Sequence, residues 1–142
     1  IGNTMEIAKE DKVKCFDFLS EFEKTIKPNF GSYNINDDHL SRFLNENKIF
    51  LGKTNKADRA KALKSRYYIV FEQTKPCGKD NDVVHHLLRH IRNAIAHGHI
   101  IKKGNNKFYI EDMKETGIMT MEGNIAKNEF FLLLEQLKQT RA

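Results

Sequence analysis

Apolar residues recur every three or four positions in five stretches of the chain, and this spacing predicts amphipathic helices. Capping residues, turn residues and the two prolines of the chain separate the stretches. The predicted helices are Asn3 to Ile26, Asp37 or Asp38 to about Asn47, Lys56 to Thr74, Asp82 to Gly98 and Ala126 to Gln139. Helices therefore dominate the expected fold.

The third predicted helix contains a segment, Tyr67 to Phe71, that alone is typical of a β-strand. The alanines, lysines and arginines before it favour helix, so the whole range is predicted as helical. After Gly98 the periodicity changes. His99 to Lys103 and Lys107 to Asp112 flank Gly104–Asn106, a pattern that predicts a β-hairpin. Gly117 to Glu122 can add a short third strand.

Short connections between long helices favour an up-and-down arrangement. We therefore expect a mainly α fold, a four-helix bundle with a small β-hairpin or sheet between its last two long helices. The length of 142 residues fits a single domain that spans residues 1–142.

The composition is that of a globular protein, with 39% hydrophobic and 30% charged residues. No apolar run has the length of a membrane span, and no secretory signal is visible. Cys15 and Cys77 match no metal-binding spacing and are typical of reduced thiols in a cytoplasmic protein. The net charge of +5, concentrated between residues 53 and 66, favours anionic partners. A solvated helix face explains that basic run somewhat better than a phosphate-binding stripe does.

The predicted helix that ends at Gly98 carries the most chemistry. Steps of three and four residues place His86, His90, Asn93 and His97 on one stripe, and His85, Arg89, Arg92 and Ala96 on a second stripe beside it. This arrangement predicts a wide basic, imidazole-rich face opposite the apolar one. Asn93, one turn before His97, is placed to orient that imidazole.

Such a set of side chains suits the cleavage of RNA by its own 2′-hydroxyl group. Histidine can remove or donate a proton near neutral pH, and Arg92 can stabilise the charge that builds on phosphorus. No metal or cofactor is required. Because the motif holds one such histidine, His97, a site shared between two chains is attractive.

The run Leu88-Arg89-His90-Ile91-Arg92-Asn93-Ala94-Ile95-Ala96-His97-Gly98 resembles the signature helix of HEPN domains (higher eukaryotes and prokaryotes nucleotide-binding). Their motif is Arg, four to six residues, then His, often with Asn directly after Arg. The hairpin and final helix that follow are similar to a bacterial subgroup of HEPN nucleases.

The resemblance implies a HEPN-like helical bundle and a metal-independent endoribonuclease that leaves 2′,3′-cyclic phosphate ends. Arg92, His97 and Asn93 would be catalytic. His90, which lies one turn before Asn93, and Arg89 are predicted to bind the substrate. It also implies a homodimer through the motif helices, a role in phage defence or in a toxin–antitoxin pair, and an antitoxin or other regulatory protein as a partner.

Two rivals to this hypothesis remain open. The first is a non-catalytic HEPN-type helical module that binds a nucleotide or a protein partner through the same basic face. The second is a metal site, because His86 and His90 have the i, i+4 spacing of a zinc-chelating pair. The sequence positions no third ligand for such a site.

Overall fold

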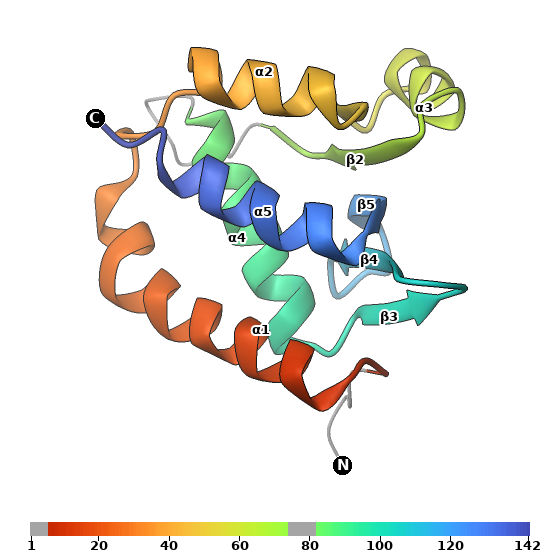
Figure 1. The fold of residues 1–142 in the computed structure, drawn as a ribbon, viewed down its shortest axis with the longest axis horizontal. Helices are drawn as coiled ribbons and strands as arrows, with labels where there is room; N and C mark the ends of the chain where they lie inside the picture. The colour runs from red at the N-terminus through yellow and green to blue at the C-terminus, as the bar shows by residue number, and fades with distance from the viewer. Residues whose placement is uncertain (1–5, 74–81) are drawn as a thin grey trace.

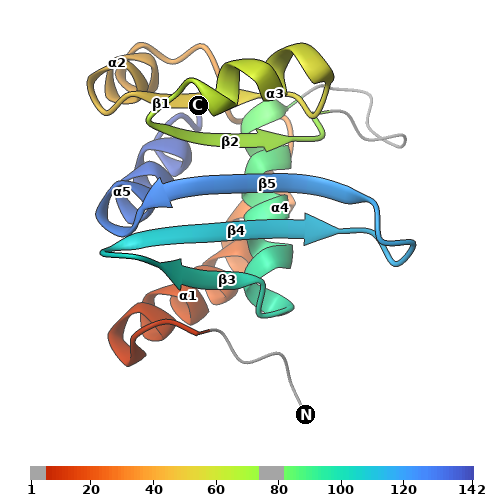
Figure 2. The same cartoon turned by 90° about the vertical axis from the view of Figure 1, so that its right-hand side faces the viewer.

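The computed structural model describes residues 6–73 and 82–142. It contains a five-stranded sheet with helices packed on it (Figure 1, Figure 2). The elements in chain order are α1 (Lys9–Glu21), the π-helical turn η1 (Phe22–Ile26), the 3-10 turn η2 (Lys27–Asn29), α2 (Asp38–Glu46), β1 (Ile49–Gly52), α3 (Lys56–Leu63), β2 (Tyr67–Phe71), α4 (Val83–Ala96), β3 (Ile100–Lys103), β4 (Lys107–Met113), β5 (Met119–Ala126) and α5 (Lys127–Lys138).

The strand order across the sheet is β1-β2-β5-β4-β3. β1 and β2 are parallel, and the other neighbouring strands are antiparallel. α1, α4 and α5 lie behind one face of the sheet, which we call the inner face (Figure 2). The opposite, outer face carries α3 at the end where β1 and β2 lie.

The expectation of a mainly α four-helix bundle is wrong. The structure is an α/β fold, and the sheet is its central layer. The error begins at the predicted helix Lys56 to Thr74, which is helical only as far as Leu63 and then continues as β2. β1 was not predicted at all, and it supplies the parallel partner that makes Tyr67–Phe71 a strand.

β2 is a strand because both of its faces are covered. Ile69 and Phe71 are fully buried on the inner face, and Val70 is buried on the outer face against α3. A continuous apolar run is typical of such a strand and can also be a segment of a buried helix. The pairing with β1 and β5 decides between the two.

Several local predictions are confirmed. α2 begins after Asp37, whose side chain accepts a hydrogen bond from the N–H of Leu40, and α4 begins after Asp82, which accepts from His85. Gly98 has a φ of 72° and ends α4 in the left-handed conformation. The hairpin forms around residues 104–106 as β3 and β4, and the third strand is longer than predicted.

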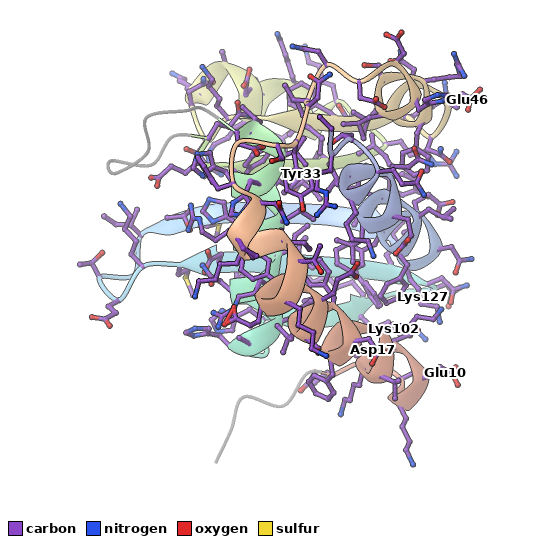
Figure 3. The ribbon with its side chains drawn as sticks, turned by 90° about the vertical axis from the view of Figure 1, so that its left-hand side faces the viewer. Glu10, Asp17, Tyr33, Glu46, Lys102 and Lys127 are labelled. Atoms are coloured by element: carbon purple, nitrogen blue, oxygen red, sulfur yellow. The ribbon has the colours of Figure 1, made fainter. Side chains whose placement is uncertain are left out.

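The first helix starts later than predicted, at Lys9, and the predicted cap Asn3 lies outside the described residues. Asp11, near the start of α1, is buried and pairs with Lys127 of α5 at 3.3 Å. On the opposite side of α1, Glu10 and Asp17 are exposed (Figure 3). α1 thus packs against α4 and is joined to α5 by this ion pair.

The hydrophobic core fills the space between the inner face of the sheet and the three covering helices. Its members include Ile69, Phe71, Phe108, Ile110, Met121 and Ile125 from the strands, Leu87, Leu88, Ile91 and Ile95 from α4, and Phe130, Leu133 and Leu137 from α5. Gly123 of β5 also faces this core, because a Cβ atom there would lie 2.9 Å from Ile69 and 3.0 Å from Ile110. Ile69 of β2 and Ile110 of β4 therefore close over Gly123 on the inner face, where a larger residue would not fit.

Candidate active site at the end of α4

α4 is buried over most of its length, and this changes the meaning of its histidines. His85, His86 and His90 are 5%, 1% and 1% exposed, so they form no solvent-facing stripe. The predicted wide imidazole-rich face is therefore wrong. Along the helix, partial or full exposure is kept only by Val83, Arg89, Arg92, Asn93 and Ala96.

His85 and His86 belong to an aromatic cluster at the start of α4. The ring of Phe30 packs edge-on against both imidazoles, at 4.7 and 5.4 Å between ring centroids. His85 Nε2 donates to the backbone carbonyl of Ile26 at 3.1 Å. Burial, and after it the neighbouring cation Arg89, lower the pKa of His86 to about 4. Both rings are consequently structural and neutral.

His90 forms the central polar contact of the site. Its Nδ1 lies 2.9 Å from Asp112 Oδ2, and its Nε2 lies 3.0 Å from the carbonyl oxygen of Glu72. Both partners are acceptors, and a neutral imidazole has only one N–H to donate. The geometry therefore favours the imidazolium form, paired with the ionised carboxylate of Asp112 in the interior.

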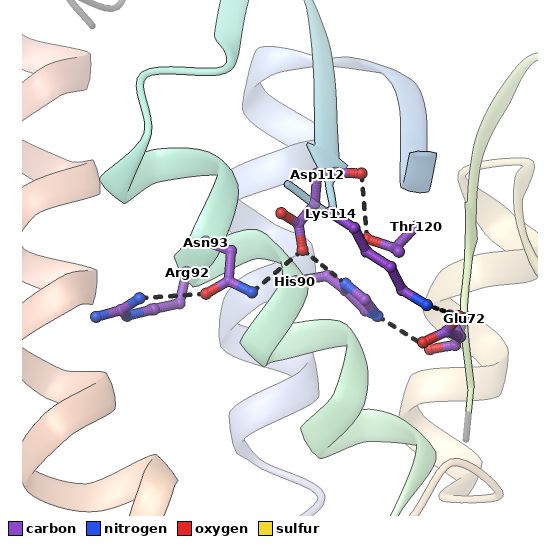
Figure 4. Close-up of polar contacts among 7 residues, drawn as sticks. All are labelled: Glu72, His90, Arg92, Asn93, Asp112, Lys114 and Thr120. Carbon is purple, nitrogen blue, oxygen red and sulfur yellow. Dashed lines mark hydrogen bonds and ion pairs between the residues drawn. The ribbon is translucent and has the colours of Figure 1, made fainter. Parts of the chain in front are cut away.

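Asn93 and Arg92 extend this contact toward solvent (Figure 4). Asn93 Nδ2 donates to Asp112 Oδ2 at 3.1 Å, and Arg92 donates to Asn93 Oδ1 at 3.2 Å. Arg92 points from α4 toward α1, on the side away from Asp112 (Figure 4). A continuous chain of hydrogen bonds thus connects the buried ion pair to the guanidinium group.

Asp112 is held as a carboxylate by its partners. Burial raises its pKa, but the hydrogen bonds from His90 and Asn93 outweigh burial and lower the pKa below its ordinary value. The backbone of Asp112 is fixed as well, because its carbonyl accepts a hydrogen bond from the hydroxyl of Thr120 at 3.1 Å. Asp112 therefore anchors the polar residues of α4 to the sheet.

His97 is the C-cap residue of α4 and is exposed. Its backbone N–H donates to the carbonyl of Asn93 at 3.0 Å, which places its side chain at the end of the helix. The ring of His99 lies beside it, with 6.0 Å between the centroids. His99 is half-buried, and its Nδ1 is buried with no partner among the described residues.

The structure thus brings Arg92, Asn93 and His97 to one end of α4, but their contacts differ from those expected. The side chain of Asn93 bonds to Asp112 and Arg92, and it does not orient the ring of His97. His90, expected to bind the substrate, is buried and can act only through Asp112. Arg89 is half-buried on the neighbouring turn, and its Nε has no partner among the described residues.

Two residues of this site were missed in the sequence. Asp112 follows an alternating strand pattern and is buried in it, and a carboxylate at a core position is a signal that it has a partner. His99 lies two residues after His97, and the left-handed Gly98 between them turns the chain so that the two rings are neighbours. Neither pairing is visible as a helical spacing.

Comparisons of the chain with protein-family models, with curated proteins and with solved structures give no match. In the two described ranges, no helix is long and apolar enough to cross a membrane. The same residues contain no group of three or more His, Cys, Asp or Glu side chains placed to hold a metal ion. The metal hypothesis for His86 and His90 also lacks free ligand atoms on His90, because both of its ring nitrogens face oxygen atoms.

Replacing the anchor carboxylate should destabilise the fold and release Arg92. We expect Asp112→Asn to lower the free energy of unfolding by about 3 kcal/mol at pH 7, because a buried ion pair loses one charge. The pKa of Asp112 in the folded state lies below its ordinary value of 3.8. Its stabilising effect is therefore complete above about pH 4 and lost as the pH falls through the folded pKa. Urea unfolding at pH 7 and pH 3 measures both effects, and equal losses at the two pH values would contradict this assignment.

His86 should make the protein acid-sensitive in a different pH range. Its pKa is about 4 in the folded state and near 6.5 in the unfolded chain, so only the unfolded state binds the proton between these values. Stability should fall by roughly 3 kcal/mol between pH 6.5 and pH 4. We expect His86→Leu to reduce this loss in urea unfolding, with a residual slope from His85, whose pKa burial also lowers. His39→Leu, at an exposed position of α2, is the control.

Proposed function

We propose that this protein is a metal-independent endoribonuclease that acts in the cytoplasm and cleaves RNA at the end of α4. The observation that supports the proposal is the exposed His97 beside His99, at the same helix end as Arg92, whose side chain is held by Asn93. The HEPN-like bundle does not support it, because the fold is different. The proposal therefore depends on the side chains at the site.

The reaction needs one proton acceptor and one proton donor. One imidazole removes the proton of the 2′-hydroxyl, and O2′ attacks phosphorus to form a P–O2′ bond. The P–O5′ bond breaks, and the second imidazole gives a proton to O5′. The products are a 2′,3′-cyclic phosphate and a 5′-hydroxyl. His97 and His99 are the two rings that the geometry offers for these transfers.

Arg92 supplies the positive charge for the phosphate. The carboxyl end of a helix carries a partial negative charge, which disfavours an anion there. A guanidinium group compensates for this charge, and its donors can follow the negative charge onto the phosphorane oxygens. The chain from His90 through Asp112 and Asn93 limits the positions that Arg92 can take, which lowers the cost of holding it in place.

The source of the second imidazole differs from the one expected. A homodimer was expected because the motif provides one histidine per chain. His99 provides another within the same chain. Most of α4 is buried, so the helix offers only a small exposed surface for contact with a second copy of the chain. We therefore propose a site that one chain completes, with partner proteins acting as regulators.

Removing the imidazole of His97 or the guanidinium group of Arg92 should abolish cleavage without unfolding the protein. We expect His97→Ala to lower the cleavage rate by 100-fold or more, on the order expected for a lost general acid or base. Arg92→Ala should cost a similar factor through lost charge stabilisation. Cleavage of a labelled single-stranded RNA in excess chelator is the measurement, with cyclic phosphate ends as its signature. His39→Ala and Arg42→Ala, both at exposed positions of α2, are matched controls.

Three outcomes of that assay would point elsewhere. Equal cleavage by the wild type and both variants would contradict the catalytic roles of His97 and Arg92 and indicate a contaminating nuclease. A wild type that binds RNA but never cleaves it would favour the non-catalytic module. Activity that chelation removes and a divalent ion restores would show that a metal takes part.

Mixing experiments should show that one chain completes the site. We expect an equimolar mixture of Arg92→Ala and His97→Ala, after co-refolding, to stay as inactive as either variant alone, because each chain lacks one required group. A site assembled from Arg92 of one copy and His97 of another would recover part of the wild-type rate. Light scattering at the assay concentration shows whether copies had paired in the mixture.

A further inference from the structure

The outer face of the sheet presents aromatic and amide side chains in one row. Tyr68 of β2 and Tyr109 of β4 are both paired with Asn124 of β5, so the three residues lie side by side across three strands. Their neighbours along β4 and β5, Phe108, Ile110, Gly123 and Ile125, are buried and point to the inner face. All three residues of the row are partly exposed. Tyr68 and Tyr109 therefore stand two strand spacings apart, about 10 Å between their backbones, on the outer face.

The amide in the middle of this row has an oxygen without a hydrogen-bond donor in the described part of the chain. Asn124 Oδ1 is buried and accepts no hydrogen bond among the described residues. A buried acceptor without a hydrogen bond destabilises a folded protein. Such an acceptor is a sign that a ligand or solvent group donates the missing hydrogen bond. A nucleobase edge has N–H donors of the kind that this oxygen would accept.

A hollow lies at one end of the row, between the sheet and α3. Its volume is about 200 Å³, and its lining includes Tyr68, Arg59 and the exposed Leu63. Arg59 is held over it by a 3.2 Å ion pair with Glu122. The basic run of residues 53–66 thus belongs largely to α3 and the turns beside it, and its Arg59 lines this hollow.

Charge is distributed unequally on the two sides of the row. Lys103 and Lys107 are paired neighbours on one side, both exposed, and the ammonium group of Lys103 lies 4.7 Å from the centre of the Tyr109 ring. Glu111 and Glu122 are paired with each other on the opposite side. The hydroxyl of Tyr109 donates to Glu122 at 2.9 Å, which fixes that ring. Phosphates are favoured on the lysine side and bases over the rings.

The same face leads to the candidate active site. His99 is paired with Glu111, whose N–H donates to the carbonyl of His99 at 3.2 Å. His99 therefore continues the Glu122–Glu111 row at the edge of the outer face, next to His97. A strand bound over the tyrosines is within a few nucleotides of the two imidazoles.

We infer that the outer face of the sheet is a binding platform for single-stranded RNA, with Tyr68 and Tyr109 stacking on bases, Asn124 contacting a base edge, and Lys103 and Lys107 binding phosphates. Its role as the substrate platform depends on the proposed ribonuclease function. Unpaired bases are required, because a duplex keeps the faces of its bases stacked. Aromatic stacking tolerates any base, so the platform provides affinity with little sequence preference.

Binding to the cleavage-deficient His97→Ala chain tests the platform without any need for catalysis. The probe is a fluorescent single-stranded RNA of about 12 nucleotides, followed by anisotropy. Adding Tyr109→Ala should raise the Kd roughly tenfold or more, the loss expected for one stacked base. Tyr109→Phe keeps the ring and should bind nearly as tightly as the parent. Tyr68→Ala is a second, independent ring variant in case Tyr109→Ala unfolds by circular dichroism.

Salt dependence tests the phosphate contacts. Each of Lys103→Ala and Lys107→Ala should reduce the slope of log Kd against log salt by about 0.7, the value for one phosphate of a single strand. Lys24→Ala, at an exposed position of the π-helical turn after α1, should leave the slope unchanged.

The inference is overturned if Tyr109→Ala and Tyr68→Ala bind as tightly as the parent. It is also overturned if duplex RNA or poly-glutamate competes as well as unlabelled single-stranded RNA, because the face would then bind anions in general. Failure of the proposed function has a different signature. In that case the wild-type chain cleaves no RNA, while the tyrosine-dependent binding remains.

Discussion

The buried pair of His90 and Asp112 is the contact on which the candidate site depends. It joins the middle of α4 to β4 and leaves each partner with further bonds, to the Glu72 carbonyl on one side and to Asn93 on the other. Charges are expensive to bury, so such a pair is maintained only when its hydrogen bonds are complete. Here the completed hydrogen bonds fix the orientation of α4. Rotation of α4 about its axis would break the pair, so the end of the helix is fixed relative to the sheet and Arg92 and His97 are fixed with it.

The order of the strands gives this contact its setting. β3, β4 and β5 follow each other in the chain, and β2 joins them only through β5. Glu72, directly after β2, meets His90 from one side, and Asp112 at the far end of β4 meets it from the other. α4 therefore crosses the inner face where two separate parts of the chain provide acceptors. The candidate site belongs to the whole sheet, although the groups proposed to react lie within eight residues of the sequence.

Local features of this chain could be predicted and non-local ones could not. The caps Asp37 and Asp82, the glycine at the end of α4 and the hairpin around residues 104–106 each depend on neighbours within a few positions. β2 depends on β1, a strand of four residues that has no periodicity of its own. The histidines were placed on a solvent-facing stripe because helical spacing cannot show that Asp112 and Phe30 cover them. Arg92, Asn93 and His97 could be grouped from the sequence because they lie at the end of one helix, whereas Asp112, the partner of Asn93, lies 19 residues away.

Side chains along β4 and β5 point alternately to the inner and the outer face of the sheet. This alternation divides them into two sets of residues with different roles. One set, which includes Phe108, Ile110 and Ile125, contacts the helices, and substitutions there change stability. The other set, which includes Tyr109 and Asn124, faces outward and carries little of the core. An exchange in the second set can alter what the surface recognises at small cost to folding, as long as the backbone register is kept. Specificity and stability can therefore diverge independently in this protein, through residues that are immediate neighbours in the chain.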